Sequence, residues 1–459
     1  MISKQFAERL LGIAMSSGAD FAELFCEVTE SNAVSAIGST IERANDTLIS
    51  GIGVRAFLGT KTVFSSSSDL SEEGMLACAK AVAAAMGDPS TPQNVLLCER
   101  VFPNLHPTEK LTTDVDAKLR AELLLSACNA ALSYDPAIKQ VTGSIFGVDH
   151  KILVANTEGL YATDRKIRTR IGISALAANE NDSQSGLAAP GSGCGLEFFD
   201  RVTPETVGRE AARQAMVNLG ATYCPAGRMT VAIENGFGGV IFHEACGHSL
   251  EASAVAIGAS QMAGKLGQKI ANEKVTAVDD GTIPGAWGSI NIDDEGTPSQ
   301  RNLLIEKGVL KSYLVDRLGS RRMGLPMTGS GRRQSYRYEA TSRMTNTFIE
   351  NGPDKNEDII ASIENGLYCK QMGGGSVDPL TGAFNFSVTE GYLVKNGKIA
   401  EAVRGATLIG TGAEILQNID MVGQNLACAE GMCGAASGSI PTNVGQPLIR
   451  VSSITVGGR

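Results

Sequence analysis

The sequence predicts an α+β protein in two domains, an N-terminal antiparallel sheet with flanking helices over residues 1–224 and a mainly β domain over residues 225–459. Its 459 residues are enough for two or three domains of about 150 residues each. The first half alternates between segments with helical spacing of apolar residues and segments with strand-like alternation. After Arg228 short strands and glycine turns predominate, in a chain with 53 glycines. We therefore place the domain boundary near residues 222–228.

The composition is that of a globular protein without excess positive charge. Hydrophobic residues make up 43% and charged residues 19% of the chain, which argues against long disordered stretches. Forty Lys and Arg residues stand against 49 Asp and Glu residues, so the net charge is −9 and no nucleic acid partner is expected. The chain start lacks a signal-peptide pattern and no run of 18 apolar residues occurs, so no membrane partner is expected. The ten cysteines show no disulfide spacing, which predicts free thiols and a cytoplasmic protein.

The first ninety residues predict a helix, three strands and a second helix. Apolar residues at helical spacing favour a helix over 3–16, with Gly18 as its stop. Ser71 caps a second helix, which the alanine-rich run behind it favours strongly. The expected elements are a helix over 3–16, strands over 21–30, 46–57 and 61–67, and a helix over 71–86.

The next segment repeats this order after a proline-rich connection. Residues 88–115 carry four prolines and are expected to form a loop whose apolar residues pack. The elements expected beyond it are a helix over 115–133, strands over 139–147, 150–155 and 159–178, a loop over 189–196 and a helix over 204–218. The repeated order suggests an internal duplication of a sheet with flanking helices, which requires the same connectivity in both copies.

The C-terminal half begins with a strand, a turn and a helix. Residues 229–233 are a short apolar strand, the glycine-rich stretch 235–239 is a turn, and 240–255 is predicted to be a helix that begins directly behind it. Further on, Lys395-Asn396-Gly397-Lys398 is a strong hairpin signal.

Two of the four histidines lie within six residues, in Phe242-His243-Glu244-Ala245-Cys246-Gly247-His248. Two imidazoles with a carboxylate directly after the first are the components of a zinc hydrolase helix. In a regular helix, however, residues five apart point about 140° from each other, so both rings could not face one ion. A π-type turn would bring them together, and Gly247 tolerates such a distortion. We therefore predict a bulge or a helix end at 245–248; the alternative is that both histidines are ordinary core residues.

The same stretch resembles the His-Glu-x-x-x-His signature of the TldD/PmbA family of zinc metallopeptidases, in its catalytic TldD-like branch. The resemblance continues through further blocks in the family's order and is denser over 225–459 than over 1–225. These blocks are Val278-Asp279-Asp280-Gly281, Ile292-Asp293-Asp294-Glu295-Gly296, Arg343-Met344-Thr345-Asn346-Thr347, Arg404-Gly405-Ala406-Thr407-Leu408-Ile409-Gly410, Gly431-Met432-Cys433-Gly434, Val444-Gly445-Gln446-Pro447 and Thr455-Val456-Gly457-Gly458.

The resemblance implies a Zn²⁺ ion held by His243, His248 and Cys433. Two imidazoles and one thiolate leave a fourth position for water, as in catalytic sites. Cys428 is the rival third ligand, but its apolar surroundings favour packing. Cys246, within the motif, is expected on a different helical face from His243 and therefore in the core.

Glu244 is the candidate general base, which takes a proton from the water that zinc activates and passes it to the leaving amine. The alternative for this residue is a carboxylate that only orients a ligand. Glu251 is either a partner of His248 or an exposed acid.

Substrate contacts are less evident from the sequence. Tyr336 and Arg343, in and just beyond the basic run 332–338, are candidate substrate-binding residues, and a solvated strand face is the alternative. The acidic stretches at 279–280 and 293–295 do not have the spacing of a calcium loop and are expected to form turns.

The sequence therefore predicts a cytoplasmic, zinc-dependent peptidase for small or unfolded peptides. The resemblance implies a homodimer, or a heterodimer with a related subunit, that encloses a peptide cavity. Two alternatives remain: a non-catalytic peptide-binding or assembly subunit, and a thiol hydrolase that uses Cys246 or Cys433.

Overall fold

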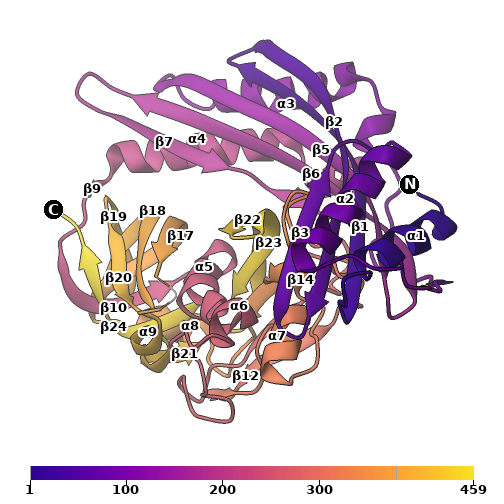
Figure 1. Ribbon diagram of the computed structural model, residues 1–459. Helices are drawn as coiled ribbons and strands as arrows, with labels where there is room; N and C mark the ends of the chain where they lie inside the picture. Colours follow the sequence, from indigo (N-terminus) through magenta and orange to yellow (C-terminus); the bar gives the residue numbers. More distant parts are fainter. Residues whose placement is uncertain (1, 379) are drawn as a thin grey trace.

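The computed structural model describes residues 2–378 and 380–459. A sheet of long strands lies above a C-terminal part in which several shorter sheets surround the segment that carries the two clustered histidines (Figure 1). Across the described residues, none of the helices has both the length and the apolar character needed to cross a bilayer. The mixed α+β architecture confirms the predicted fold class.

The N-terminal part contains the long sheet and two pairs of helices. Its strand order is β3-β2-β1-β5-β6-β4, with β7 and β8 also pairing with β6. The elements are α1 (Lys4–Ala14), β1 (Phe21–Ile37), β2 (Thr40–Leu58), β3 (Lys61–Ser67), α2 (Glu72–Met86), β4 (Cys98–Glu99), η1 (Thr112–Asp114), α3 (Ala117–Leu132), β5 (Ile138–Asn156), β6 (Leu160–Ala178), β7 (Ser183–Ala188), β8 (Gly191–Ser192), η2 (Leu196–Asp200) and α4 (Pro204–Gly220).

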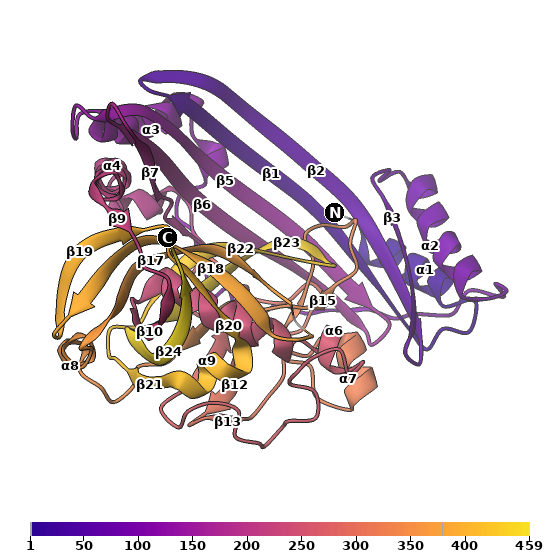
Figure 2. The same cartoon turned by 90° about the vertical axis from the view of Figure 1, so that its left-hand side faces the viewer.

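The strands of this sheet are longer than expected from the sequence, and the two stretches predicted at 139–147 and 150–155 are one strand, β5. The helix pairs cover opposite ends of the long strands (Figure 2), where they bury separate apolar cores. Polar residues such as Glu30 and Asp149 occupy the middle of the strands, between the two cores, and form ion pairs there. Because the prediction relied on apolar alternation, it ended strands where this polar middle begins.

The two N-terminal halves have the same connectivity. Each consists of a helix, three antiparallel strands and a second helix, in the orders α1-β1-β2-β3-α2 and α3-β5-β6-β7-α4. The duplication hypothesis requires this shared connectivity of the two halves. The halves do not form two sheets, however, because β1 pairs with β5 along 15 residues of each strand, from Glu23↔Asn156 to Ile37↔Thr142, and joins them into one.

The C-terminal part is mainly β. One sheet has the order β17-β10-β24-β20-β18-β19-β9, with β21 on β24, and another has the order β13-β12-β11-β16-β23-β22. The elements are β9 (Thr222–Tyr223), β10 (Gly227–Ile233), η3 (Gly236–Gly239), α5 (Val240–Phe242), η4 (His243–Gly247), η5 (His248–Leu250), α6 (Ala252–Val255), β11 (Ala277–Asp280), β12 (Arg301–Glu306), β13 (Val309–Leu310), α7 (Arg317–Met323), β14 (Gly331–Arg332), β15 (Thr341–Ser342), β16 (Asn346–Ile349), α8 (Asn356–Ala361), β17 (Asn365–Val377), β18 (Ala383–Lys395), β19 (Lys398–Arg404), β20 (Thr407–Thr411), α9 (Gly412–Asn418), β21 (Ile419–Val422), β22 (Ala427–Ala435), β23 (Gly438–Gln446) and β24 (Ile449–Gly457).

Two local predictions for this part have opposite outcomes. The hairpin at 395–398 is confirmed, since Asn396 and Gly397 join β18 to β19 with φ of 50° and 73°. The single helix predicted over 240–255 is wrong. The segment is divided into α5, a π-helical turn, a 3₁₀ turn and the short helix α6, because it bends inside the core of the C-terminal part.

Buried ion pairs connect the long sheet to the C-terminal part. Arg55 on β2 pairs with Glu23 at 2.8 Å and with Glu295, and Lys166 on β6 lies 2.5 Å from Asp294. Arg333 also pairs with Glu23, at 3.0 Å. The acidic stretch at 293–295 therefore forms interdomain contacts as well as a turn. The alternative of a solvated strand face for the basic run is wrong at Arg332 and Arg333, both of which are buried.

A second interdomain contact allows a stability prediction. Glu390 on β18 is buried and accepts hydrogen bonds from Arg213 on α4, at 3.0 and 2.6 Å, from the Tyr392 hydroxyl and from Lys370. Burial raises the pKa of Glu390, but the hydrogen bonds from Arg213, Tyr392 and Lys370 outweigh it and hold the pKa below the ordinary value of 4.5. A carboxylate whose pKa is lowered by folding stabilises the folded state above its unfolded pKa, and this contribution disappears as the pH falls through the folded pKa.

We expect Glu390→Gln to lower the free energy of unfolding by about 2 kcal/mol at pH 7, because it replaces the buried, charged acceptor of the partly exposed Arg213 and Lys370 with a neutral one. The difference from the unsubstituted protein should shrink as the pH falls below 4.5, which denaturant unfolding at several pH values would measure. Glu210→Gln is the matched control, since Glu210 pairs with the same Arg213 but is 48% exposed. Equal losses in both variants, or a difference that does not change with pH, would contradict the argument.

Candidate metal centre

The chain turns sharply where it enters the histidine segment. Strand β10 ends at Ile233, and Gly238 and Gly239 then pass against the end of β23. A Cβ atom on Gly239 would lie 2.3 Å from the backbone nitrogen of Gly445, so no side chain fits there. This close approach sets the position from which α5 leads into the motif.

The predicted π-type turn is confirmed. Residues His243–Gly247 form a π-helical turn, and a 3₁₀ turn begins at His248. Gly247 also suits the packing, because a Cβ atom there would lie 2.3 Å from the Met344 sulfur and the Met344 side chain would have to move. The i→i+5 repeat brings the two imidazoles to one side of the segment, with their ring centroids 5.0 Å apart and their planes at 85°.

Cys433 comes from a distant strand to meet both rings. The Sγ atom of Cys433 on β22 lies 3.2 Å from Nε2 of His243 and 3.2 Å from Nε2 of His248. All three side chains are buried, and their potential ligand atoms lie within 4.8 Å of one another. Figure 1 shows the hairpin of β22 and β23 at the centre of the molecule, between the long sheet and α5.

Arg343 holds the end of this hairpin through three hydrogen bonds. Its guanidinium donates to the carbonyl oxygen of Cys433 at 2.5 Å, to Ser437 Oγ at 2.9 Å and to the carbonyl oxygen of Gly438 at 2.9 Å. Arg343 is completely buried. These contacts bind the backbone around Cys433, so the structure gives Arg343 a role in holding the sulfur in position.

The electrostatics of the cluster favour a thiolate at Cys433. Burial raises the pKa of Cys433, but the charge of His243 and the hydrogen bonds with both histidines outweigh it and lower the pKa to about 4. Thiolate is the form of cysteine that binds metal ions. Two imidazole nitrogens and one thiolate within this distance also have the chemistry of a catalytic zinc site with an open position, so the residues fit the metal.

Glu251 and Glu244 flank His248 on opposite sides of its ring. Oε2 of Glu251 lies 3.2 Å from Nδ1 of His248, so this carboxylate can accept a hydrogen bond and leave Nε2 facing Cys433. Oε2 of Glu244 lies 3.7 Å from Nε2 of His248, the ring nitrogen that faces Cys433. The Glu244 side chain is 21% exposed, and burial raises its pKa. A carboxylate with a raised pKa that water can reach has the properties of a proton acceptor.

Comparison with known proteins shows the family of the chain. Three family models match the chain in succession: PmbA/TldA metallopeptidase domain 1 over residues 22–85, the central domain over 110–219 and the C-terminal domain over 226–458. The chain belongs to the PmbA/TldD metallopeptidase family.

Curated members of the PmbA/TldD family resemble the chain along much of its length. The "Metalloprotease TldD homolog" of Haemophilus influenzae is 36% identical over 470 residues, which cover 100% of this chain and 97% of that protein. The "Zinc metalloprotease TldD homolog" of Saccharolobus solfataricus is 32% identical over 235 residues, which cover 51% of this chain and 52% of that protein.

Solved structures share the PmbA/TldD fold. TldE from Thermococcus kodakarensis matches with a TM-score of 0.77 at 17% identity, over 99% of this chain and 98% of that one. A Thermotoga maritima protein described as a candidate modulator of a DNA gyrase matches with a TM-score of 0.80 at 20% identity, over 99% of this chain and 100% of that one.

In the described part of the chain, the remaining predicted residues supply no ligand atom to the centre. Cys246 is fully buried in the C-terminal core, and Cys428 is not part of the cluster formed by the described residues. Tyr336 is buried against the long sheet, where it packs with Phe25 and Ile292. Its backbone nitrogen donates to Glu27. Tyr336 thus belongs to the interdomain core of this PmbA/TldD family member, not to the metal centre.

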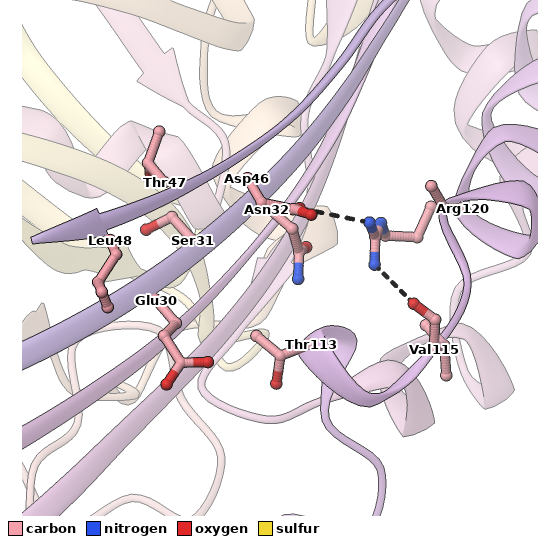
Figure 3. Close-up of a pocket in the computed structure, with 10 residues that line it drawn as sticks. Glu30, Ser31, Asn32, Asp46, Thr47, Leu48, Thr113, Val115 and Arg120 are labelled. Atoms are coloured by element: carbon pink, nitrogen blue, oxygen red, sulfur yellow. Dashed lines mark hydrogen bonds and ion pairs between the residues drawn. The ribbon is translucent and has the colours of Figure 1, made fainter.

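One cavity lies beside the β22–β23 hairpin that carries Cys433, and another lies on the long sheet. A cavity of about 990 Å³ between α4, β7, β17 and β22 is lined by residues that include Phe237, Glu430 and Met432. Because Met432 precedes Cys433, this cavity reaches the residue next to the cluster. A cavity of about 460 Å³ lies instead on the long sheet, between β1, β2 and the start of α3, where Arg120 contacts Val115 and Asp46 (Figure 3). Among the described residues, neither a histidine nor a cysteine lines this cavity of about 460 Å³, so it lacks the side chains that could bind zinc.

Sequence reasoning missed one of the two partners that hold the centre in place, Arg343, and named the other, Glu251, as one of two alternatives. The contact of Arg343 with the Cys433 backbone joins residues 90 positions apart, and the spacing of residues carries no signal for it. The signal for Glu251 was present, since a carboxylate three residues after a histidine can reach it within one helical turn.

Proposed function

We propose that the protein is a zinc-dependent peptidase that hydrolyses small or unfolded peptides in an enclosed cavity. The observation that carries the proposal is the meeting of His243, His248 and Cys433 within 4.8 Å, with the carboxylate of Glu244 beside them. A family of metallopeptidases and relatives named as metalloproteases support it. We assign zinc because this donor set suits it and because one relative is named a zinc metalloprotease.

In the proposed mechanism His243, His248 and Cys433 hold the ion and Glu244 moves the proton. Zinc, when bound, acts as a Lewis acid that polarises a carbonyl and makes water more acidic. Glu244 takes a proton from the attacking water and delivers it to the leaving amine. Glu251 keeps the imidazole of His248 oriented through Nδ1, and Arg343 keeps the Cys433 backbone in place.

The cavity of about 990 Å³ beside Met432 is the proposed place for the peptide. Strand edges that line it can pair with an extended chain through main-chain hydrogen bonds, which do not depend on side-chain sequence. We propose further that the protein works in the cytoplasm as a homodimer or as a heterodimer with a related subunit. Such a dimer would close the cavity and admit only small or unfolded chains.

Two other functions fit these observations less well. A non-catalytic peptide-binding or assembly subunit has no use for an intact set of metal ligands with an acid beside them. A thiol hydrolase would need a free nucleophilic sulfur, but Cys246 is fully buried, and burial raises its pKa to about 12. Cys433 lies between two imidazoles at 3.2 Å, an arrangement that suits ligation better than attack on a substrate.

The test is peptide hydrolysis by the purified protein before and after chelation. We expect one zinc ion per chain, loss of hydrolysis of an unstructured peptide on treatment with 1,10-phenanthroline, and recovery when Zn²⁺ is restored. Hydrolysis that survives complete metal removal and stops on thiol alkylation would point to the thiol enzyme. Zinc binding without hydrolysis of any unstructured peptide would point to the non-catalytic subunit.

A further inference from the structure

A smaller cavity near the metal centre, distinct from the two described above, is lined by several cationic side chains. It has a volume of about 360 Å³ and lies between the long sheet and the β22–β23 hairpin. Its charged lining includes Lys166, Arg168 and Arg332. Its apolar lining includes Phe146, Val148 and Ile440. Met432, the residue before Cys433, borders both this cavity and the larger one.

Most of the charges around this cavity are already paired. Lys166 pairs with Asp294 at 2.5 Å, and Nε2 of His150 lies 2.7 Å from a carboxylate oxygen of Glu27. Arg333 pairs with Glu23. Among the described residues, Arg168 and Arg332 are the lining cations for which no carboxylate lies within ion-pair distance.

Arg168 is held in place by neutral groups and leaves its terminal nitrogens free. Its side chain is buried, and Nε donates to the carbonyl oxygen of Trp287 at 2.9 Å. Its guanidinium carbon lies 6.0 Å from the centre of the Trp287 ring. Nη1 and Nη2 take part in none of the hydrogen bonds or ion pairs found in the described part of the chain. Arg168 is therefore a buried, oriented guanidinium with two unused terminal nitrogens beside a cavity.

Arg332 adds a second buried cation for which the described residues supply no ion pair. Its guanidinium donates only to carbonyl oxygens, that of Met344 at 2.5 Å and that of Pro441 at 2.9 Å. Burial lowers the pKa of Arg168 to about 9, and the nearby charge of Arg332 contributes to this shift. The carboxylate of Asp294, which also lines the cavity, offsets part of both charges without forming an ion pair with either arginine. Buried cations that are only partly compensated are costly to a folded protein, and a bound anion would lower the cost.

We propose that Arg168 binds the C-terminal carboxylate of the peptide substrate, with Arg332 supplying further positive charge. The inference rests on the proposed peptidase function and names how that site selects its substrate. A guanidinium with two free terminal nitrogens matches a carboxylate in a bidentate pair. The apolar residues of the same cavity suit the side chain of a terminal residue, which an inorganic anion lacks. A peptide that fills the larger cavity and passes Met432 would end at Arg168.

Trp287 allows binding to be measured without turnover. It is the only tryptophan of the chain, is buried and contacts Arg168 directly. We would titrate full-length Glu244→Gln protein with tetra-alanine that ends in a free carboxylate and with tetra-alanine amide, and follow the fluorescence of Trp287. The free acid should bind on the order of tenfold or more tightly than the amide, as expected for a hydrogen-bonded charge pair.

Variants of Arg168 test the assignment. Arg168→Gln should reduce the affinity for the free acid to that for the amide, and Arg168→Lys should keep part of the difference because the positive charge remains. The matched control is Arg165→Gln, on the same strand but 46% exposed and paired with Asp149, which should leave the acid-to-amide ratio unchanged. Thermal unfolding of each variant identifies one that fails to fold, and the Lys variant then carries the test.

Several outcomes would overturn the inference. These are equal affinity of the unsubstituted Arg168 protein for acid and amide, an acid preference that persists in Arg168→Gln, and equally tight binding of a peptide amide that carries an internal glutamate. Displacement of the free acid by millimolar inorganic phosphate would show a general anion site and would also overturn it. A preference for the acid in a protein that hydrolyses no peptide would keep this inference while the proposed function fails, so the two are separable.

Discussion

Glu244→Gln is expected to lower the rate of peptide hydrolysis by about 10³-fold while leaving the zinc content at one ion per chain. Glutamine has nearly the same volume as glutamate but cannot accept the proton of the attacking water. The side chain of Glu244 lies 3.7 Å from His248 Nε2 and is not within the set of atoms that meets around Cys433, so the metal should stay bound. Initial rates on an unstructured peptide, with zinc measured by atomic absorption on the same sample, test both parts of the expectation.

Glu306→Gln is a suitable control, because Glu306 is 49% exposed and pairs with Lys311 away from the centre. This variant should keep full activity. If Glu244→Gln lost its zinc instead of its activity per bound zinc, the carboxylate would have an orienting role. If it kept its activity, the assignment of the general base would be wrong.

Cys433→Ser is expected to weaken zinc binding by more than about 100-fold and to abolish hydrolysis. Loss of a residue that merely supports a ligand costs 10–100-fold in affinity, so loss of a thiolate ligand should cost more. A serine hydroxyl at the same place is not ionised near neutral pH, whereas the pKa of Cys433 is lowered to about 4 by the two histidines despite burial. Competition with a zinc chelator of known affinity measures the change.

Cys428→Ser is the matched control on the same strand. Cys428 lies five residues before Cys433 on β22 and outside the cluster of potential ligands, so its replacement should leave zinc affinity and activity nearly unchanged. A larger effect of Cys428→Ser than of Cys433→Ser would reverse the choice between the two sulfurs.

The sequence predicted the parts of the fold that local patterns encode. The helices around residues 3–16, 71–86, 115–133 and 204–218 are confirmed, because each has a cap or a strong apolar face within its own length. The π-type turn was predictable for the same reason, since the five-residue spacing of His243 and His248 is incompatible with a regular helix that presents both rings to one point.

Features that depend on distant residues were not predictable from local patterns. Strand β5 looked like two strands because its middle is polar, and only the long sheet shows that Asp149 pairs there with Arg165 from the next strand. The basic run at 332–338 looked suited to solvent or substrate, whereas Arg333 pairs with Glu23 more than 300 residues away. Long-range ion pairs leave no periodic trace in the sequence, so the interdomain contacts and the role of Arg343 required the structure.

The most direct test of the central claim is X-ray absorption spectroscopy at the zinc K-edge of the purified protein. The claim is that His243, His248 and Cys433 bind one ion together. It predicts one sulfur scatterer at about 2.3 Å and two imidazole nitrogens at about 2.0 Å, with the sulfur contribution missing in Cys433→Ser. A spectrum without sulfur in the unsubstituted protein, or one that Cys433→Ser leaves unchanged, would contradict the claim.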